Sequence, residues 1–302
     1  MNKPAVYLVI TIDTEADHST DWTKSSPLAF KSVTESIPNV LQPVFKKYGA
    51  IGTYLLTTEV LEDDESVRIL KPIRDESELG THLHPEYIGP EKKYLKYAGT
   101  YSTEFSNNLD ISVEKEKLSN LTRLFEEKIG CSSKVYRGGK FGFGDNTASS
   151  LASLGYLVDT SVTPGVSWRN IGGPNFTKFS DQPYFIKNKS GDKILLEVPV
   201  SIIFLNSVYK FFNRPVWLRP SFNSPHDMKR LVHKFISKYS SSDVIVLNMM
   251  FHSMEFYPGA SPYSRNQEDC NRLIGDLESI IGYCREIGVT FCKLSHIRGL
   301  YA

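Results

Sequence analysis

Residues 5–17 read AVYLVITIDTEAD, a run of apolar and β-branched residues that leads directly into the acids Asp13, Glu15 and Asp17. A strand that is apolar on both faces is typical of a parallel sheet covered by helices. Similar short apolar runs recur along the chain at 50–57, 78–84, 134–138, 156–160, 194–200, 243–251 and 289–293. The sequence therefore predicts a sheet of mostly parallel strands.

Amphipathic helical patterns separate these runs. They lie at 34–48, 113–129, 146–154, 225–239 and 266–287. Alternating strands and helices imply right-handed βαβ units, so we predict an α/β fold. The number of units favours a distorted or incomplete (β/α) barrel of about seven parallel strands, with an open doubly wound sheet as the alternative. The chain contains no Gly-x-Gly-x-x-Gly sequence and no phosphate-loop lysine motif to support a nucleotide site.

The composition narrows the choice of partners. Lysine and arginine number 35 against 34 acids, and a net charge of +1 gives no reason to expect a nucleic-acid or anionic-membrane partner. No apolar run approaches the roughly 18–20 residues that a membrane span needs. The run at 6–12 has strand length and leads into acids, unlike a signal peptide, so we expect a cytoplasmic protein. The four cysteines indicate reduced thiols.

We predict a single domain over 1–302 with two loop insertions, near 85–111 and 201–222. Both stretches are rich in tyrosine, phenylalanine or tryptophan. Long loops in compact domains are often functional, and these aromatic rings would suit stacking on sugar rings. The alternatives are packing as a satellite core and pairing with a second copy in a homo-oligomer.

The first candidate for chemistry is a set of acids and histidines at the ends of two predicted strands. Asp13 and Glu15 are two residues apart, as are His82 and His84. Side chains at i and i+2 of a strand point to the same face, so each pair can converge. Two neutral imidazoles beside carboxylates suit zinc, and also iron, cobalt or nickel. A solvated strand end is the alternative for the acids alone; together with the histidines they favour a metal site.

Three further clusters also follow predicted strands. Arg137 precedes the glycine-rich stretch that contains Lys140 and Phe141, where an arginine can hold a carboxylate and glycines can let backbone approach a ligand. The stretch 158–165, with Asp159 and Ser161, would orient the arginine, line a pocket or form a structural turn.

The last cluster begins with His252, which ends a strongly apolar run and is a candidate general acid or base; Tyr263 follows it. His18, His226, His233 and His296 fall on predicted loops or helices and are interpreted as structural. In (β/α) barrels the active site lies at the carboxyl ends of the strands. Because all five clusters fall at such ends, we expect them to meet.

These motifs resemble the polysaccharide deacetylase family, the NodB-homology group of carbohydrate esterases, over roughly residues 5–295. The usual first motif of the family is Thr-Phe-Asp-Asp-Gly, and here it reads Thr11-Ile12-Asp13-Thr14-Glu15. The usual second motif of the family is His-x-x-x-His. Here it is the shorter His82-Leu83-His84, as in divergent members of the family. Arg137, the stretch 159–161 and Met250-Phe251-His252 match the remaining motifs.

The resemblance implies a role for each matching residue. Asp13 takes the position of the base and Arg137 that of the arginine that positions it. Glu15, in place of the usual second Asp, is the candidate acidic ligand beside His82 and His84, with Asp13 as the alternative. His252 takes the position of the general acid. The implied cofactor is one divalent transition metal, zinc being favoured.

We therefore predict a metal-dependent hydrolase that removes an N-acyl group, N-acetyl being favoured, from an amino sugar in a polysaccharide or glycolipid precursor. Lys140, Phe141, Asp159, Ser161 and Tyr263 are the candidate substrate-binding residues. One alternative keeps the fold and changes the substrate to a cyclic amide or formamide. The other is a catalytically silent carbohydrate-binding protein.

Overall fold

The computed structural model describes residues 3–90, 92, 104–206 and 213–301. Its main sheet has nine strands, in the order β10-β1-β2-β3-β4-β5-β7-β6 with β11 paired to β1. The strands are β1 (Ala5–Thr14), β2 (Gly52–Leu56), β3 (Glu78–Leu83), β4 (Val135–Gly138), β5 (Val158–Asp159), β6 (Tyr184–Lys187), β7 (Lys193–Glu197), β10 (Val244–His252) and β11 (Thr290–Phe291). A separate ribbon pairs β8 (Ile202–Asn206) with β9 (Asn213–Trp217).

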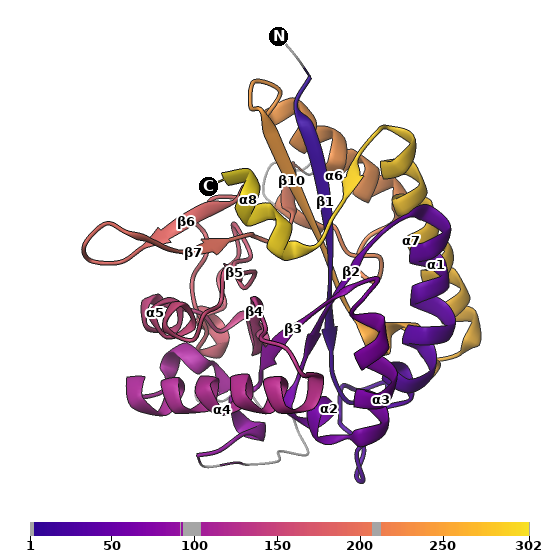
Figure 1. Ribbon diagram of the computed structural model, residues 1–302. Coiled ribbons are helices and arrows are strands. Elements are labelled where there is room, and N and C mark those ends of the chain that lie inside the picture. Colours follow the sequence, from indigo (N-terminus) through magenta and orange to yellow (C-terminus); the bar gives the residue numbers. More distant parts are fainter. Residues whose placement is uncertain (1–2, 91, 93–103, 207–212, 302) are drawn as a thin grey trace.

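Helices cover the outside of this curled sheet (Figure 1). They are α1 (Gln42–Tyr48), α2 (Thr58–Glu62), α3 (Asp64–Ile73), α4 (Ile111–Ile129), α5 (Asp145–Ser153), α6 (Pro225–Lys238), α7 (Gln267–Glu286) and α8 (Ile297–Tyr301). The strands from β10 to β7 in the sheet order pair in parallel, and only β6 joins antiparallel. The prediction of an incomplete (β/α) barrel with about seven parallel strands is confirmed.

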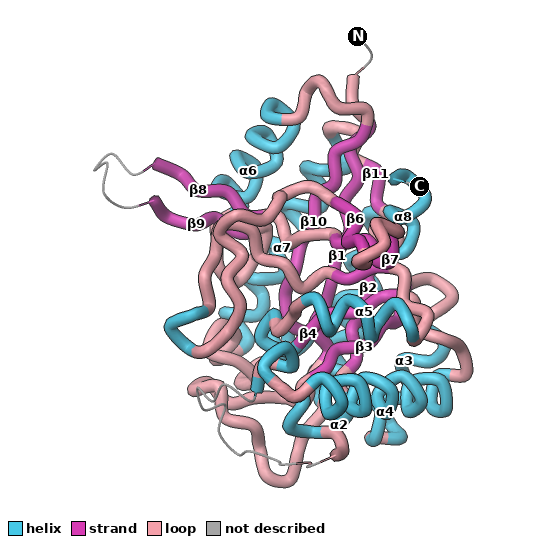
Figure 2. The backbone as a smooth tube through the Cα atoms, turned by 90° about the vertical axis from the view of Figure 1, so that its left-hand side faces the viewer, coloured by secondary structure: helices cyan, strands magenta, loops and turns pink. Residues whose placement is uncertain are grey.

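The barrel is closed without a regular strand pair between β10 and β7. Ser201 donates its backbone N–H to the carbonyl of Asn248 at 3.0 Å, and its carbonyl accepts from the N–H of Leu218 at 2.9 Å. The N–H of Met250 then donates to the carbonyl of Leu218 at 3.2 Å. Irregular backbone on either side of the β8–β9 ribbon therefore fills the gap. The ribbon itself extends away from the barrel (Figure 2).

The inner face of the barrel changes from apolar to polar along β1 and β4. At the amino end, Val9, Val135, Val158 and Val246 share one buried cluster with Leu294 and Ile297 from the C-terminal segment. Alternate residues of a strand share a face, so Thr11 and Asp13 continue the line that Val9 begins. In the same way Arg137 follows Val135. The C-terminal segment thus covers the apolar end, and the polar groups collect at the carboxyl end.

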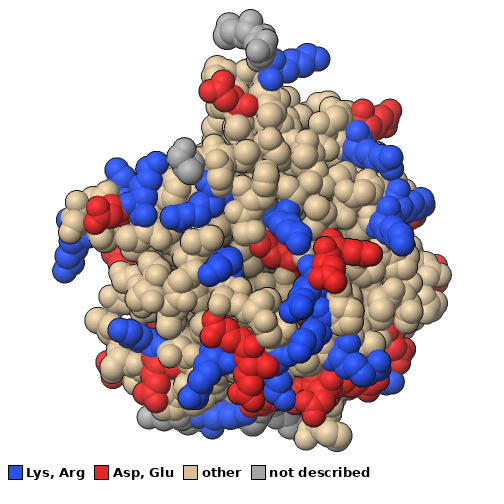
Figure 3. Space-filling view, in the orientation of Figure 1, with Lys and Arg blue, Asp and Glu red and all other residues tan. Residues whose placement is uncertain are grey.

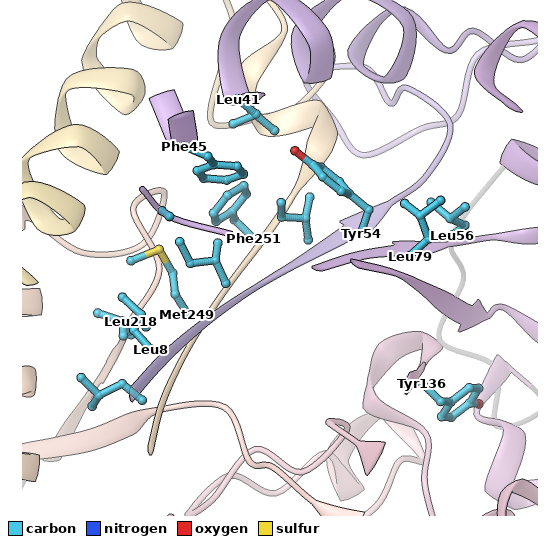
Figure 4. Packing of buried hydrophobic residues seen from close by; sticks show 14 of the residues in the cluster. Leu8, Leu41, Phe45, Tyr54, Leu56, Leu79, Tyr136, Leu218, Met249 and Phe251 are labelled. Carbon is cyan, nitrogen blue, oxygen red and sulfur yellow. The ribbon is translucent and has the colours of Figure 1, made fainter. Parts of the chain in front are cut away.

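The outer face of the sheet packs on the helices through the largest buried cluster. It includes Phe45 of α1 and Phe251 and Met249 of β10, which lie close together between helix and sheet (Figure 4). Burying a side chain of this size contributes about 1.5–3 kcal/mol. The two strands that carry Asp13 and His252 are therefore held on a well-packed support.

Several elements differ from those the sequence predicts. The predicted helix 34–48 consists of a π-helical segment, Ser32–Leu41, followed by α1. Pro38 and Pro43 lack an N–H and so remove two α-helical hydrogen bonds, which is compatible with the wider winding. Helices α2 and α3, strand β6 and the β8–β9 ribbon have no counterpart in the sequence prediction. The aromatic residues Tyr94, Tyr97, Tyr101, Tyr209, Phe211 and Phe212 lie outside the described residues.

Candidate active site

The parallel register brings the predicted motifs to one edge of the sheet. Asp13 at the end of β1 pairs with His252 at the end of β10. His82 of β3 pairs with Arg137 of β4 in the same way. Glu15 extends one i+2 step beyond Asp13. Four strands thus carry their polar residues to the carboxyl end of the barrel, where active sites of such folds lie.

Glu15, His82 and His84 converge as a candidate metal site. The Oε1 atom of Glu15 lies 3.3 Å from Nε2 of His82 and 3.4 Å from Nε2 of His84. One ligand atom from each of the three lies within 4.8 Å of the others, and all three residues are buried. Two imidazole nitrogens and one carboxylate oxygen form a donor set that suits zinc and other divalent transition metals.

The other nitrogen of each imidazole is occupied by an acceptor. Nδ1 of His82 lies 2.9 Å from the carbonyl oxygen of Arg137, and Nδ1 of His84 lies 3.1 Å from Oε1 of Glu86. Both Nδ1–H groups can donate, so the Nε2 lone pairs face Glu15. Metal-binding histidines are held in this way by an acceptor behind the ring. The residues present therefore fit a metal ion.

The charges of the cluster agree with a site for a cation. Burial acts to raise the pKa of Glu15, but His84, His82 and Lys24 outweigh it and hold the pKa well below its ordinary value. Burial acts to lower the pKa of His84, and the Glu15 and Glu86 carboxylates raise it instead to about 10. Without a metal, a proton on His84 supplies the positive charge that the carboxylates require.

Arg137 fixes Asp13 beside the cluster. It is fully buried, and its Nη1 donates to Oδ1 of Asp13 at 2.6 Å. Its Nε donates to the carbonyl of Thr160 at 2.9 Å and its Nη2 to Oγ1 of Thr11 at 2.6 Å. Burial acts to raise the pKa of Asp13, but the charge of Arg137, with smaller contributions from His82 and His252, lowers it. Asp13 is therefore held as an oriented carboxylate.

His252 lies on β10, on one side of β1, whereas His82 and His84 lie at the end of β3, on the other side. Its Nε2 is 3.8 Å from Oδ2 of Asp13 and 3.8 Å from Oε1 of Glu15. Its Nδ1 is 2.9 Å from Oε1 of the buried Glu255, which also pairs with Arg219. The same Nδ1 lies 3.1 Å from Nη2 of Arg219, which can only donate. When Nδ1 carries a proton it donates to Glu255, and Nε2 faces the cluster, as a proton donor there would require.

The predicted substrate-binding residues are not all brought to the cluster. Asp159 and Ser161 are fully buried, and Asp159 accepts from the backbone N–H and the hydroxyl of Ser161 at 2.9 and 2.8 Å. Thr160, between them, contacts Arg137. Of the uses considered for this stretch, the geometry favours orienting the arginine.

The other three predicted residues pack against neighbouring charged and aromatic side chains. Lys140 pairs with the buried Glu104, and Phe141 stacks on Trp168 at 5.6 Å between ring centroids. Tyr263 packs edge-on against Trp22, at 5.6 Å. The glycine-rich turn that carries Lys140 lies close to the candidate ligand His84. A Cβ atom on Gly139 would lie 3.0 Å from the His84 ring. The turn thus packs directly on one of the candidate ligands.

Sequence reasoning missed several residues of the site. Glu255 follows His252 at i+3, a spacing that could have identified it. Arg219 lies within the predicted loop 201–222, and its guanidinium sits 4.0 Å from the centre of the Phe222 ring. Trp22 and Lys24 come from a segment without any predicted element. The ring of Trp22 lies 5.7 Å from that of His252, so this segment covers one side of the site.

Comparisons with known proteins agree on the fold. No protein-family model matches the sequence, and no curated protein matches it. Among solved structures, a protein described as a polysaccharide deacetylase from Pseudomonas aeruginosa PAO1 is 15% identical with a TM-score of 0.59, covering 98% of this chain and 90% of that one. A counterpart from Mycobacterium smegmatis is 17% identical with a TM-score of 0.56, covering 99% and 91%. The allantoinase Puue is 14% identical with a TM-score of 0.59, covering 98% and 89%.

These structures match nearly the whole chain at low sequence identity. Among the described residues, no helix is long and apolar enough to cross a membrane. Figure 3 shows charged side chains of both signs next to one another, mainly over the lower half of this face and along its edges. The resemblance that the sequence motifs indicate is confirmed at the level of architecture: the chain has the fold of the polysaccharide deacetylases of the NodB-homology group.

Proposed function

We propose that this protein is a metal-dependent hydrolase that removes an N-acyl group, N-acetyl in the first instance, from an amino sugar. The observation that carries the proposal is the convergence of the Glu15 carboxylate with the Nε2 atoms of His82 and His84 at 3.3 and 3.4 Å. Asp13 and His252 flank that cluster from two neighbouring strands. Metal-assisted hydrolysis of an amide uses such a combination of a cation site, a base and an acid.

Glu15, His82 and His84 would hold the metal, for which we propose zinc. When bound, such an ion lowers the pKa of a coordinated water and stabilises negative charge on the carbonyl oxygen of a substrate. Asp13, ionised and fixed by Arg137, accepts the proton of the attacking water. His252, with Glu255 behind its ring, delivers a proton to the departing amine. Acetate and the free amino sugar leave as products.

Phe141, Tyr263 and Lys140 would contact the sugar. The ring of Tyr263 packs on Trp22, which in turn contacts His252, and Phe141 stacks on Trp168. Aromatic rings suit the apolar faces of sugars. Asp159 and Ser161 would act on the substrate only through the position of Arg137, because their own polar groups bond to each other.

A substrate panel on the zinc-loaded protein tests the proposal. We expect release of acetate from N-acetylated amino-sugar oligomers or nucleotide- or lipid-linked monomers, measured enzymatically. Formylated sugars and cyclic imides form the other arms, because the second function considered from the sequence is a cyclic amide or formamide hydrolase and Puue shares the fold. Turnover of cyclic imides alone would replace the sugar proposal with that second function.

The Asp13→Asn variant separates catalysis from metal binding. We expect kcat to fall by about 10²–10⁴-fold, the usual contribution of a general base, while zinc content stays near that of the wild type. A variant that kept a near-normal rate would contradict the role of Asp13. A wild type that binds sugars but hydrolyses nothing in the panel would favour a silent carbohydrate-binding protein.

A further inference from the structure

Lys24 lies directly behind the candidate metal ligand Glu15. Its Nζ is 3.9 Å from Oε2 of Glu15 and 2.7 Å from Oε1 of Glu59. The same Nζ lies 3.9 Å from the centre of the Tyr87 ring. The Lys24 side chain is only 9% exposed, so its ammonium is enclosed between α2, the ring and the carboxylate.

The two oxygens of Glu15 therefore have different neighbours. Oε1 faces both imidazoles, whereas Oε2 faces Lys24. A carboxylate can bind a cation through one oxygen or through both, and a partner on one oxygen biases that choice. Because Lys24 is enclosed, it is poorly placed to bind substrate itself.

The segment that carries Lys24 is anchored at several points. The carboxylate of Asp17 accepts from the backbone N–H groups of Lys31 at 2.6 Å and Ser32 at 3.1 Å. Within the segment, His18 and Lys24 form an antiparallel bridge. The segment is thus folded back so that Lys24 faces the strand end from which Glu15 projects.

Resting on the proposed function, we propose that Lys24 is a positioning residue that makes Glu15 a one-oxygen metal ligand, and that Glu59 holds Lys24 for this purpose. Glu59 lies on α2, is buried, and balances the charge of the ammonium. The Lys24–Glu59 pair therefore adds no net charge behind the site. Its contribution is the orientation of the Glu15 carboxylate.

Charge and orientation predict different results when the whole pair is removed. Because Lys24 and Glu59 together carry no net charge, removing both would leave metal affinity unchanged if only charge mattered. If Lys24 positions Glu15, removing the pair weakens binding. Removing Lys24 alone would leave Glu59 buried without a counter-ion, so the informative variant is Lys24→Met/Glu59→Gln, which removes both charges and keeps similar side-chain length.

The experiment measures zinc affinity by competition with a chromophoric chelator at fixed pH, and the visible absorption of the Co²⁺-substituted protein. We expect the double variant to bind zinc about 10–100-fold more weakly, the usual effect of losing a group that holds a metal ligand. Its Co²⁺ spectrum should change in intensity, since that spectrum reports coordination. Lys24→Arg should restore affinity to within a few-fold of the wild type.

Lys31→Met is the matched control, because Lys31 belongs to the same segment but makes an exposed pair with Glu35. Circular dichroism verifies that each variant is folded. Wild-type affinity and an unchanged Co²⁺ spectrum in a folded double variant would overturn the role of Lys24 and leave the proposed function standing. A wild type that binds no zinc or cobalt would overturn both.

Discussion

The ion pair between Arg137 and Asp13 gives a prediction for stability that does not depend on any substrate. Both side chains are almost fully enclosed, and the guanidinium also bonds to Thr11 and Thr160. Breaking a buried pair by removing one partner costs about 3–5 kcal/mol, because the other charge stays buried without compensation. We therefore expect Arg137→Met to lower the free energy of unfolding by about that amount at neutral pH.

The loss should depend on pH in a defined direction. In the wild type the pKa of Asp13 is lowered, so its stabilising contribution is present above the ordinary aspartate pKa and is lost as pH falls through the lowered value. Without Arg137, the effect of burial on the pKa of Asp13 is opposed only by the weaker effects of His82 and His252. Protonation of Asp13 then removes the unpaired buried charge. The difference between wild type and Arg137→Met should therefore shrink on acidification.

Urea unfolding followed by circular dichroism between pH 4 and 8 provides the measurement. Asp13→Asn/Arg137→Met, which leaves no unpaired charge, should be more stable than Arg137→Met alone. Arg68→Met is the control, because Arg68 forms an exposed pair with Glu65 that is worth at most about 1 kcal/mol. An Arg137→Met protein within about 1 kcal/mol of the wild type at neutral pH would refute the assignment of a buried, coupled pair.

Two further predictions concern buried carboxyl groups. Glu255→Gln removes the negative charge behind His252. We therefore expect kcat on the substrate identified in the panel to fall by about 10²-fold, with zinc content unchanged. An unaltered kcat would exclude His252 as an acid supported by Glu255. Burial, and then the charge of Asp159, raise the pKa of Glu197 well above its ordinary value. The folded protein therefore binds more protons than the unfolded chain above the ordinary glutamate pKa, and wild-type stability should decline as pH rises through that window. Glu197→Gln should flatten the decline in urea unfolding at pH 5–8, whereas an identical slope would contradict the raised pKa.

The sequence predicted the parts of the site that follow strands. Asp13, His82, Arg137 and His252 all end apolar runs, and parallel strands bring their carboxyl ends to one edge, so strand pattern alone was enough to place them together. The fold followed from the same runs. The i, i+2 spacing of the acids and of the histidines already predicts that each pair points to one face of its strand.

The sequence could not predict what packs around those residues. Lys24 and Arg219 reach the site from irregular backbone, where no periodicity indicates a direction. Asn248 donates from inside β10 to Oγ1 of Thr160 at 2.6 Å, but in the sequence it is one polar residue within an apolar run. The strands of the β8–β9 ribbon carry no clear alternation of apolar and polar residues, so the sequence predicts a loop there. Such contacts depend on tertiary packing rather than on local pattern.

Metal content of the purified protein tests the central claim most directly. Elemental mass spectrometry should find about one equivalent of a divalent transition metal in the wild type after loading with zinc, and loss of that metal in His82→Ala/His84→Ala. Circular dichroism of both proteins verifies that the fold is retained. A wild type that holds no metal after loading, or a double variant that retains it in full, would contradict the site formed by Glu15, His82 and His84.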